Sequence, residues 1–145
     1  MNDFLKNHEG YTDPTAHEAL SAIFKEEAST RYATYRPIVY ICSPLAGDVE
    51  ANMERARGFC RFAVAQGAIP IAPHLLFTQF MGEETKEVRA LALHMGLVLV
   101  SKCRELWYFG DIISEGMRGE IRKARARGMP VRRFTEDCRE VTEDA

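Results

Sequence analysis

The order of apolar and polar positions predicts strands that alternate with helices. The segment PIVYIC (37–42) is a short apolar run without helical spacing, which is typical of a strand buried on both faces of a parallel sheet. Charged and apolar residues then repeat at helical spacing over 49–65 and stop before Gln66 and Gly67, which predicts a helix and its end. AIPIAPH (68–74) follows as a second strand-like run, so these segments predict one strand–helix–strand unit.

The same alternation continues through the second half of the chain. GEETKEVRALALHMGLVLVSKC (82–103) is long enough to be mostly helical, and ELWYFG (105–110) is an aromatic strand candidate. A further helix is expected from about Gly116 to Arg127, and MPVRRF (129–134) is expected as the final strand. Strands that alternate with helices predict an α/β fold with a doubly wound, Rossmann-like or flavodoxin-like parallel sheet flanked by helices.

The two ends of the chain lie outside this alternation. In DPTAHEALSAIFKEE (13–27), Asp13 can cap a helix, and apolar residues recur at helical spacing. This helix is expected to be an appendage that provides packing surface or a dimer contact. We therefore expect a helical extension and linker over 1–36, an α/β domain over 37–134 and a polar tail over 135–145.

Composition narrows the possible functions. The chain has 145 residues, of which 46% are hydrophobic and 28% charged, with 19 Lys and Arg against 21 Asp and Glu. This fits one globular domain, and the formal charge of −2 gives no basic field for duplex nucleic acid. The four cysteines form no CxxC pair, and no His, Cys or carboxylate grouping shows metal spacing, so no metal site is predicted. No cofactor is expected either. Without a leader or an apolar run of about 20 residues, the expected location is cytoplasmic, away from membranes.

Two loops stand where a parallel sheet binds ligands. SPLAGD (43–48) follows the first predicted strand and GDIISEG (110–116) follows ELWYFG, and ligands bind at the carboxyl ends of such strands. Glu120 lies about one turn into the next helix and flanks its apolar stripe. From position alone, this carboxylate could simply complement the positive end of the helix dipole.

The segments VYICSP (39–44), IPIAPH (69–74) and ELWYFGDIISEGMRGEIRKARARGMPV (105–131) resemble the nucleoside 2-deoxyribosyltransferase superfamily. They are particularly similar to small phage-associated members of undefined function and to deoxynucleoside monophosphate N-glycosidases. The resemblance covers about residues 37–134. It implies that Glu120 is the nucleophile that attacks the anomeric carbon and that Tyr40 lies near the sugar and the nucleophile. The implied activity is hydrolysis or transfer of the N-glycosidic bond of a (deoxy)nucleoside or its 5′-monophosphate.

The resemblance also implies substrate contacts from both loops. SPLAGD resembles a loop that cradles the substrate, and Ser114 is similar to a serine that binds phosphate. Structural interpretations stay open: Tyr40 could be a core aromatic, Ser114 a helix cap and His74 a structural residue, and capping is favoured for Asp48. The candidate substrate-binding residues are Ser43, Pro44, Leu45, Gly47, Asn52, His74, Asp111, Ser114, Gly116 and Met117.

The chain departs from the superfamily at one position. Members commonly carry an aspartate that handles the proton of the leaving base, and its place falls near Gly96, where no carboxylate is present. Two other functions therefore remain open: a nucleotide-binding or sensing module without chemistry, and a structural protein of a phage or prophage locus. Because superfamily members complete their pockets across subunits, a homodimer or larger homo-oligomer is expected.

Overall fold

The computed structural model describes residues 35–142, together with residues 18 and 22. The chain divides into two units, Met1–Tyr35 and Arg36–Ala145. The predicted N-terminal helix over 13–27 lies outside the described residues except for Glu18 and Ala22, which are both helical. The architecture below is that of the second unit.

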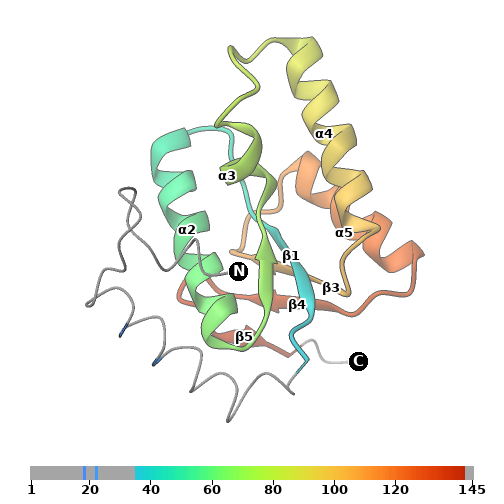
Figure 1. Ribbon diagram of the computed structural model, residues 1–145. Coiled ribbons are helices and arrows are strands. Elements are labelled where there is room, and N and C mark those ends of the chain that lie inside the picture. The colour runs from blue at the N-terminus through green and yellow to red at the C-terminus, as the bar shows by residue number, and fades with distance from the viewer. Residues whose placement is uncertain (1–17, 19–21, 23–34, 143–145) are drawn as a thin grey trace. The chain divides into compact units, whose positions relative to one another are not determined.

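A five-stranded sheet forms the centre of this unit, with the strand order β2-β1-β3-β4-β5 (Figure 1). The first four strands run parallel to their neighbours, and β5 is antiparallel to β4. Their bounds are β1 Ile38–Cys42, β2 Ile69–Ile71, β3 Glu105–Phe109, β4 Val131–Phe134 and β5 Glu140–Val141. The predicted doubly wound α/β fold is therefore confirmed, with one antiparallel edge strand added.

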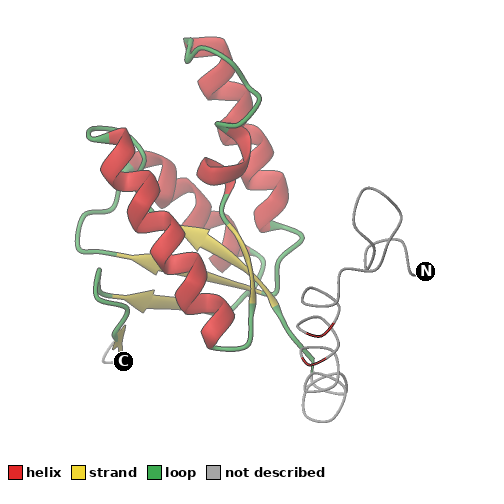
Figure 2. Ribbon diagram, turned by 60° about the vertical axis from the view of Figure 1, so that its left-hand side comes forward, coloured by secondary structure: helices red, strands yellow, loops and turns green. Residues whose placement is uncertain are grey.

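Helices lie on both sides of this sheet (Figure 2). Their bounds are α2 Val49–Ala65, α3 Pro73–Phe77, α4 Lys86–Val100 and α5 Glu115–Ala126. Side chains of β1 alternate between two apolar cores: Val39 packs with residues of α2, whereas Tyr40 packs with residues of α4 and α5. This alternation explains why PIVYIC is apolar throughout, because both faces of a central parallel strand are covered. No helix within the described ranges has the length and apolar character to cross a bilayer.

Two segments differ from the sequence prediction. The strand-like run AIPIAPH stops at Ile71, and Pro73 begins α3, because proline suits the first turn of a helix. His74 consequently lies in a helix instead of at a strand end. MPVRRF is not the last strand, since β5 lies within the expected polar tail. There the guanidinium of Arg132 donates to both carboxylate oxygens of Glu140, at 2.9 and 2.7 Å.

Candidate active site

The buried face of α5 carries the carboxylate of Glu120. Met117, Ile121 and Ala124 form the apolar stripe of this helix, and Glu120 lies beside it with 7% of its surface exposed. The hydroxyl of Tyr40, on β1, donates a hydrogen bond to Oε2 of Glu120. Cys42, two residues further along the same strand, has its Sγ 3.7 Å from Oε1 of Glu120. Two residues on one face of β1 thus hold the two carboxylate oxygens.

Burial controls the protonation of this cluster. It raises the pKa of Glu120 to about 7, although hydrogen bonds from Tyr40 and Cys42 act in the opposite direction. Burial, and then the neighbouring Glu120 carboxylate, raise the pKa values of the Tyr40 hydroxyl and the Cys42 thiol well above their ordinary values. Both groups therefore remain protonated donors near neutral pH, whereas the Glu120 carboxyl can change its ionisation there.

Gly96 of α4 lies directly over the Tyr40–Glu120 pair. A Cβ atom at this position would be 2.9 Å from the Tyr40 hydroxyl and 3.7 Å from Oε2 of Glu120. Only glycine permits so close an approach of the helix. Gly96 stands near the position to which the family resemblance assigns an aspartate, and it does face the Glu120 carboxylate. Because glycine has no side chain, only the backbone of α4 lies there and no acidic group is provided.

The SPLAGD loop is held together by hydrogen bonds from within the chain. The Asn52 side-chain amide donates to the carbonyl oxygens of Leu45 and Ala46, at 3.0 and 2.9 Å. Gly47 turns the chain with φ +98°, a value that favours glycine. Asp48 accepts from the Ala51 amide at 3.1 Å and caps α2, which confirms the capping interpretation. The predicted residues Leu45 and Asn52 are thus in contact, but in this structure the Asn52 side chain stabilises the loop.

His74 and Ser43 meet at the carboxyl end of β1. Nε2 of His74 lies 2.8 Å from the Ser43 carbonyl oxygen, and burial lowers the pKa of the imidazole. The neutral ring therefore donates Nε2–H to that carbonyl. The Ser43 hydroxyl is buried and has no hydrogen-bond partner within the described part of the chain. The His74 ring thus stabilises the backbone of the SPLAGD loop at Ser43.

A small cavity of about 20 Å³ opens beside the SPLAGD loop. It is lined by Ser43, Pro44, Asn52, Arg55, Phe59, Phe109 and Glu136. Three predicted residues therefore meet here, whereas Glu120 lies on the other face of the sheet and does not line the cavity. Sequence reasoning missed Arg55, although its place three residues after Asn52 on α2 would have indicated it.

The β3–α5 loop uses its predicted residues mainly for structure. The Ser114 hydroxyl accepts from the Met117 amide at 3.2 Å and caps α5. A Cβ at Gly116 would lie 3.2 Å from the Leu93 side chain of α4, so this glycine allows the two helices to pack. Met117 is a core residue with 1% exposure. The Asp111 side chain is 91% exposed and pairs with Arg133 at 3.4 Å.

The described residues contain no group of three or more His, Cys, Asp or Glu side chains that could hold a metal ion. All four cysteines are free.

Comparison with known proteins finds a similar fold. The solved structure of a 2-deoxyribosyltransferase from the psychrotolerant bacterium Bacillus psychrosaccharolyticus is similar, with a TM-score of 0.57 and 16% sequence identity. The likeness covers 73% of this chain and 77% of that chain. At this identity the likeness concerns the fold alone. No curated protein matches the sequence. Residues 37–134, more than half of the chain, match the family described as a domain of unknown function, DUF7768, and the chain belongs to this family.

Proposed function

We propose that the chain is an N-glycosidic enzyme, a hydrolase or transferase that acts on a (deoxy)nucleoside or its 5′-monophosphate. The observation that carries the proposal is the buried Tyr40–Glu120 pair, in which an ionisable carboxylate receives a hydrogen bond from a protonated tyrosine. A carboxylate held in this way can act as a nucleophile at an anomeric carbon. The similar fold of a 2-deoxyribosyltransferase supports this substrate class.

The proposed reaction has two displacements at C1′ of the sugar. An oxygen of ionised Glu120 attacks C1′, the C1′–N bond breaks, and its electron pair goes to the departing base. The product is a glycosyl ester on Glu120, and the base takes its proton from water because Gly96 provides no acid. Water or a second base then attacks C1′, and the electrons of the ester bond return to Glu120. Tyr40 orients the carboxylate during both steps.

A 5′-monophosphate is the proposed preferred form of the substrate. The Ser114 oxygen already accepts from the Met117 amide, but its own proton can be donated to a phosphate oxygen at the N-terminus of α5. Calorimetry should give a lower Kd for deoxynucleoside monophosphates than for deoxynucleosides. The difference should shrink in Ser114→Ala and persist in Ser114→Thr, which keeps both the cap and the hydroxyl. Equal affinities in the wild type would contradict the phosphate assignment.

A second candidate function is a nucleotide-binding or sensing module without chemistry. It is favoured by Gly96, which provides no carboxylic acid for the leaving base, and by the burial of Glu120 beneath α4. General acid catalysis typically contributes about 10²–10⁴-fold in rate, so its absence weighs against turnover. Thermal shifts with nucleotides, combined with the absence of released base, would favour this module.

The proposed activity is tested by incubating the protein with a panel of nucleosides and nucleotides and separating the released base by chromatography. We expect release by the wild type and loss of several orders of magnitude in Glu120→Gln. Glu115→Gln, at an exposed glutamate on the same helix, is the matched control and should retain activity. Release by Glu120→Gln at the wild-type rate would refute the role of Glu120.

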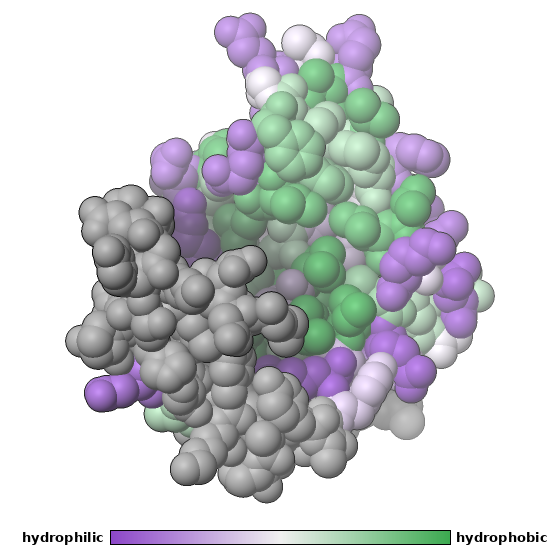
Figure 3. All heavy atoms as spheres, in the orientation of Figure 1, coloured by the Kyte–Doolittle hydropathy of each residue, from purple (hydrophilic) through white to green (hydrophobic). Residues whose placement is uncertain are grey.

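We further propose a homodimer formed through α3 and α4. Although α4 is apolar on all sides from Ala90 to Val100 except at His94, only Gly96 and Val100 are buried, and a helical segment of this composition is normally covered. Figure 3 shows apolar side chains gathered over α3 and α4 on one face. The exposed large apolar residues of this surface are Leu76, Phe80, Leu91 and Val98. An exposed apolar patch of this kind is typical of a protein–protein contact.

Charge indicates that the partner is a second copy. The N-terminus of α4 carries three acidic residues, Glu83, Glu84 and Glu87, against two basic ones, Lys86 and Arg89, so it is slightly acidic, whereas Lys102 and Arg104 follow its C-terminus. Antiparallel packing of α4 across a two-fold axis would therefore place the acidic end against the basic end. Light scattering should give twice the chain mass of 16.4 kDa. Val98→Glu (46% exposed) should give monomers, and the control Val64→Glu on α2 (48% exposed) should not.

A further inference from the structure

A groove on the outer side of α5 takes no part in the proposed reaction. It has a volume of about 310 Å³ and is lined by Tyr108, Ile113, Arg118, Ile121, Arg122 and Arg125. Tyr108 and Ile121 are almost fully buried, so together with Ile113 they form an apolar floor, and the three arginines form the rim. Glu120 points to the opposite, buried side of the same helix and does not line this groove.

The three arginines are arranged to act together. They are separated by four and three residues on α5, so they project from the same side of the helix over successive turns. Within the described part of the chain, the side chains of Arg118 and Arg122 form no ion pair or hydrogen bond. The chain as a whole carries a formal charge of −2. This concentration of positive charge is therefore a local feature of the groove.

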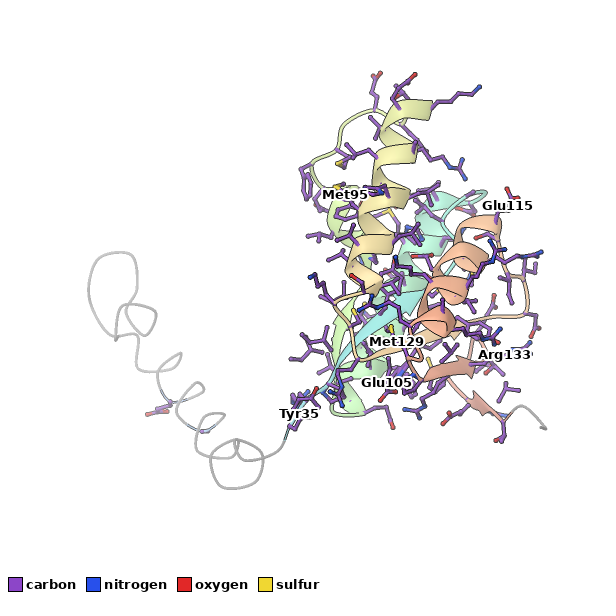
Figure 4. The ribbon with its side chains drawn as sticks, turned by 90° about the vertical axis from the view of Figure 1, so that its right-hand side faces the viewer. Tyr35, Met95, Glu105, Glu115, Met129 and Arg133 are labelled. Carbon is purple, nitrogen blue, oxygen red and sulfur yellow. The ribbon has the colours of Figure 1, made fainter. Side chains whose placement is uncertain are left out.

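A fourth arginine lies beside the floor. Arg133 of β4 is the register partner of Tyr108 of β3, and its guanidinium contacts the exposed carboxylate of Asp111 at 3.4 Å. Figure 4 labels Arg133 of β4 and Glu115, which lies at the start of α5. Asp111, the acidic partner of Arg133, is exposed to solvent, and three arginines line the groove itself.

We propose that this groove binds a nucleoside triphosphate, with the phosphates on the arginine rim and the base and sugar on the apolar floor. Guanidinium groups form bidentate, charge-assisted hydrogen bonds to phosphate oxygens, and several of them along one edge match a chain of phosphates. A groove of this volume suits a small molecule, and an apolar floor favours a ligand with an uncharged part over a bare inorganic ion. The site is separate from Glu120 and does not depend on the proposed reaction.

Calorimetric titrations test this assignment with ATP, dTTP and inorganic tripolyphosphate as probes. Both triphosphates should bind more tightly than tripolyphosphate, because only they can contact Ile113 and Ile121. In Arg118→Gln/Arg122→Gln, affinity should fall by about a hundredfold, roughly tenfold for each lost contact to a charged group. Lys123→Gln removes the same charge from an exposed residue of the same helix outside the groove, and it should change affinity by less than about twofold.

Five results would overturn the assignment. One is the absence of binding of all three probes to the wild type, and another is an equal loss of affinity in Lys123→Gln and in the double variant. Displacement of the triphosphate by a deoxynucleoside, or loss of its binding in Glu120→Gln, would assign the ligand to the Glu120 site. A single-stranded oligonucleotide that binds about a hundredfold more tightly than either triphosphate would assign the arginines to nucleic acid.

Discussion

Replacing Glu120 with glutamine is expected to stabilise the protein at alkaline pH. Burial raises the pKa of this carboxyl from its ordinary value of 4.5 to about 7. At ~1.4 kcal/mol per pKa unit, this difference corresponds to about 3 kcal/mol. Between these two pH values the folded protein keeps a proton that the unfolded chain releases, so the free energy of unfolding falls as pH rises. Above pH 7 the buried Glu120 carboxylate is charged, and the loss of about 3 kcal/mol in the free energy of unfolding is complete.

Glutamine should remove this penalty because it has nearly the same shape, carries no charge and keeps an oxygen that accepts from Tyr40. We expect Glu120→Gln to be more stable than the wild type by up to about 3 kcal/mol at pH 8 and to differ little near pH 4.5. Urea denaturation at pH 4.5, 6, 7 and 8 measures the difference. Exposed Glu115, on the same helix, provides the control. The difference in the free energy of unfolding between Glu115→Gln and the wild type should not increase between pH 6 and 8.

A stability difference between Glu120→Gln and wild type that stays constant from pH 4.5 to 8 would refute this reasoning. It would mean that Glu120 does not carry a poorly solvated charge in the folded protein. A stabilising effect, combined with loss of glycosidic activity, would indicate that the carboxylate is retained for function at the expense of stability.

Of three further predictions, two concern the same cluster and the third concerns a glycine on α5 outside it. Tyr40→Phe removes a hydrogen bond that lowers the pKa of Glu120, so the pH at which activity rises should move upward in a pH–rate profile; an unchanged profile would contradict the role of Tyr40. Gly96→Ala should lower the free energy of unfolding by about 1–3 kcal/mol, because its Cβ would meet the Tyr40 hydroxyl at 2.9 Å. Gly119→Ala, which meets nothing within 4 Å, should instead stabilise by about 0.5–1 kcal/mol, and urea denaturation of both variants checks the pair.

The central elements could be predicted because local patterns define them. PIVYIC is apolar throughout since both faces of β1 are covered, and α2 and α5 each begin at a capping side chain, Asp48 and Ser114. Strand β5 could not be predicted in this way. It has two residues, and it depends on pairing with β4 and on the bonds between Arg132 and Glu140, neither of which is a periodic feature.

The candidate site shows the same division. Tyr40 and Glu120 are 80 residues apart, and only the family resemblance predicted from the sequence that they lie close together. The role of Cys42 depends on how α5 packs against β1, and that of Gly96 on how closely α4 approaches Tyr40, and no spacing in the sequence reveals either. The run RKARARG has the pattern of a solvated helix face, and only the fold places Tyr108 and Ile113 beside its arginines to form a groove.

The central claim is tested most directly by mass spectrometry of peptides from protein that has been incubated with a deoxynucleoside or its monophosphate and quenched in acid. The proposed reaction predicts that the peptide containing Glu120 gains the mass of a deoxyribosyl group, with or without its 5′-phosphate, and that Tyr40→Phe lowers the yield. Released base accompanied by an unmodified Glu120 peptide, or an adduct on a different residue, would contradict it.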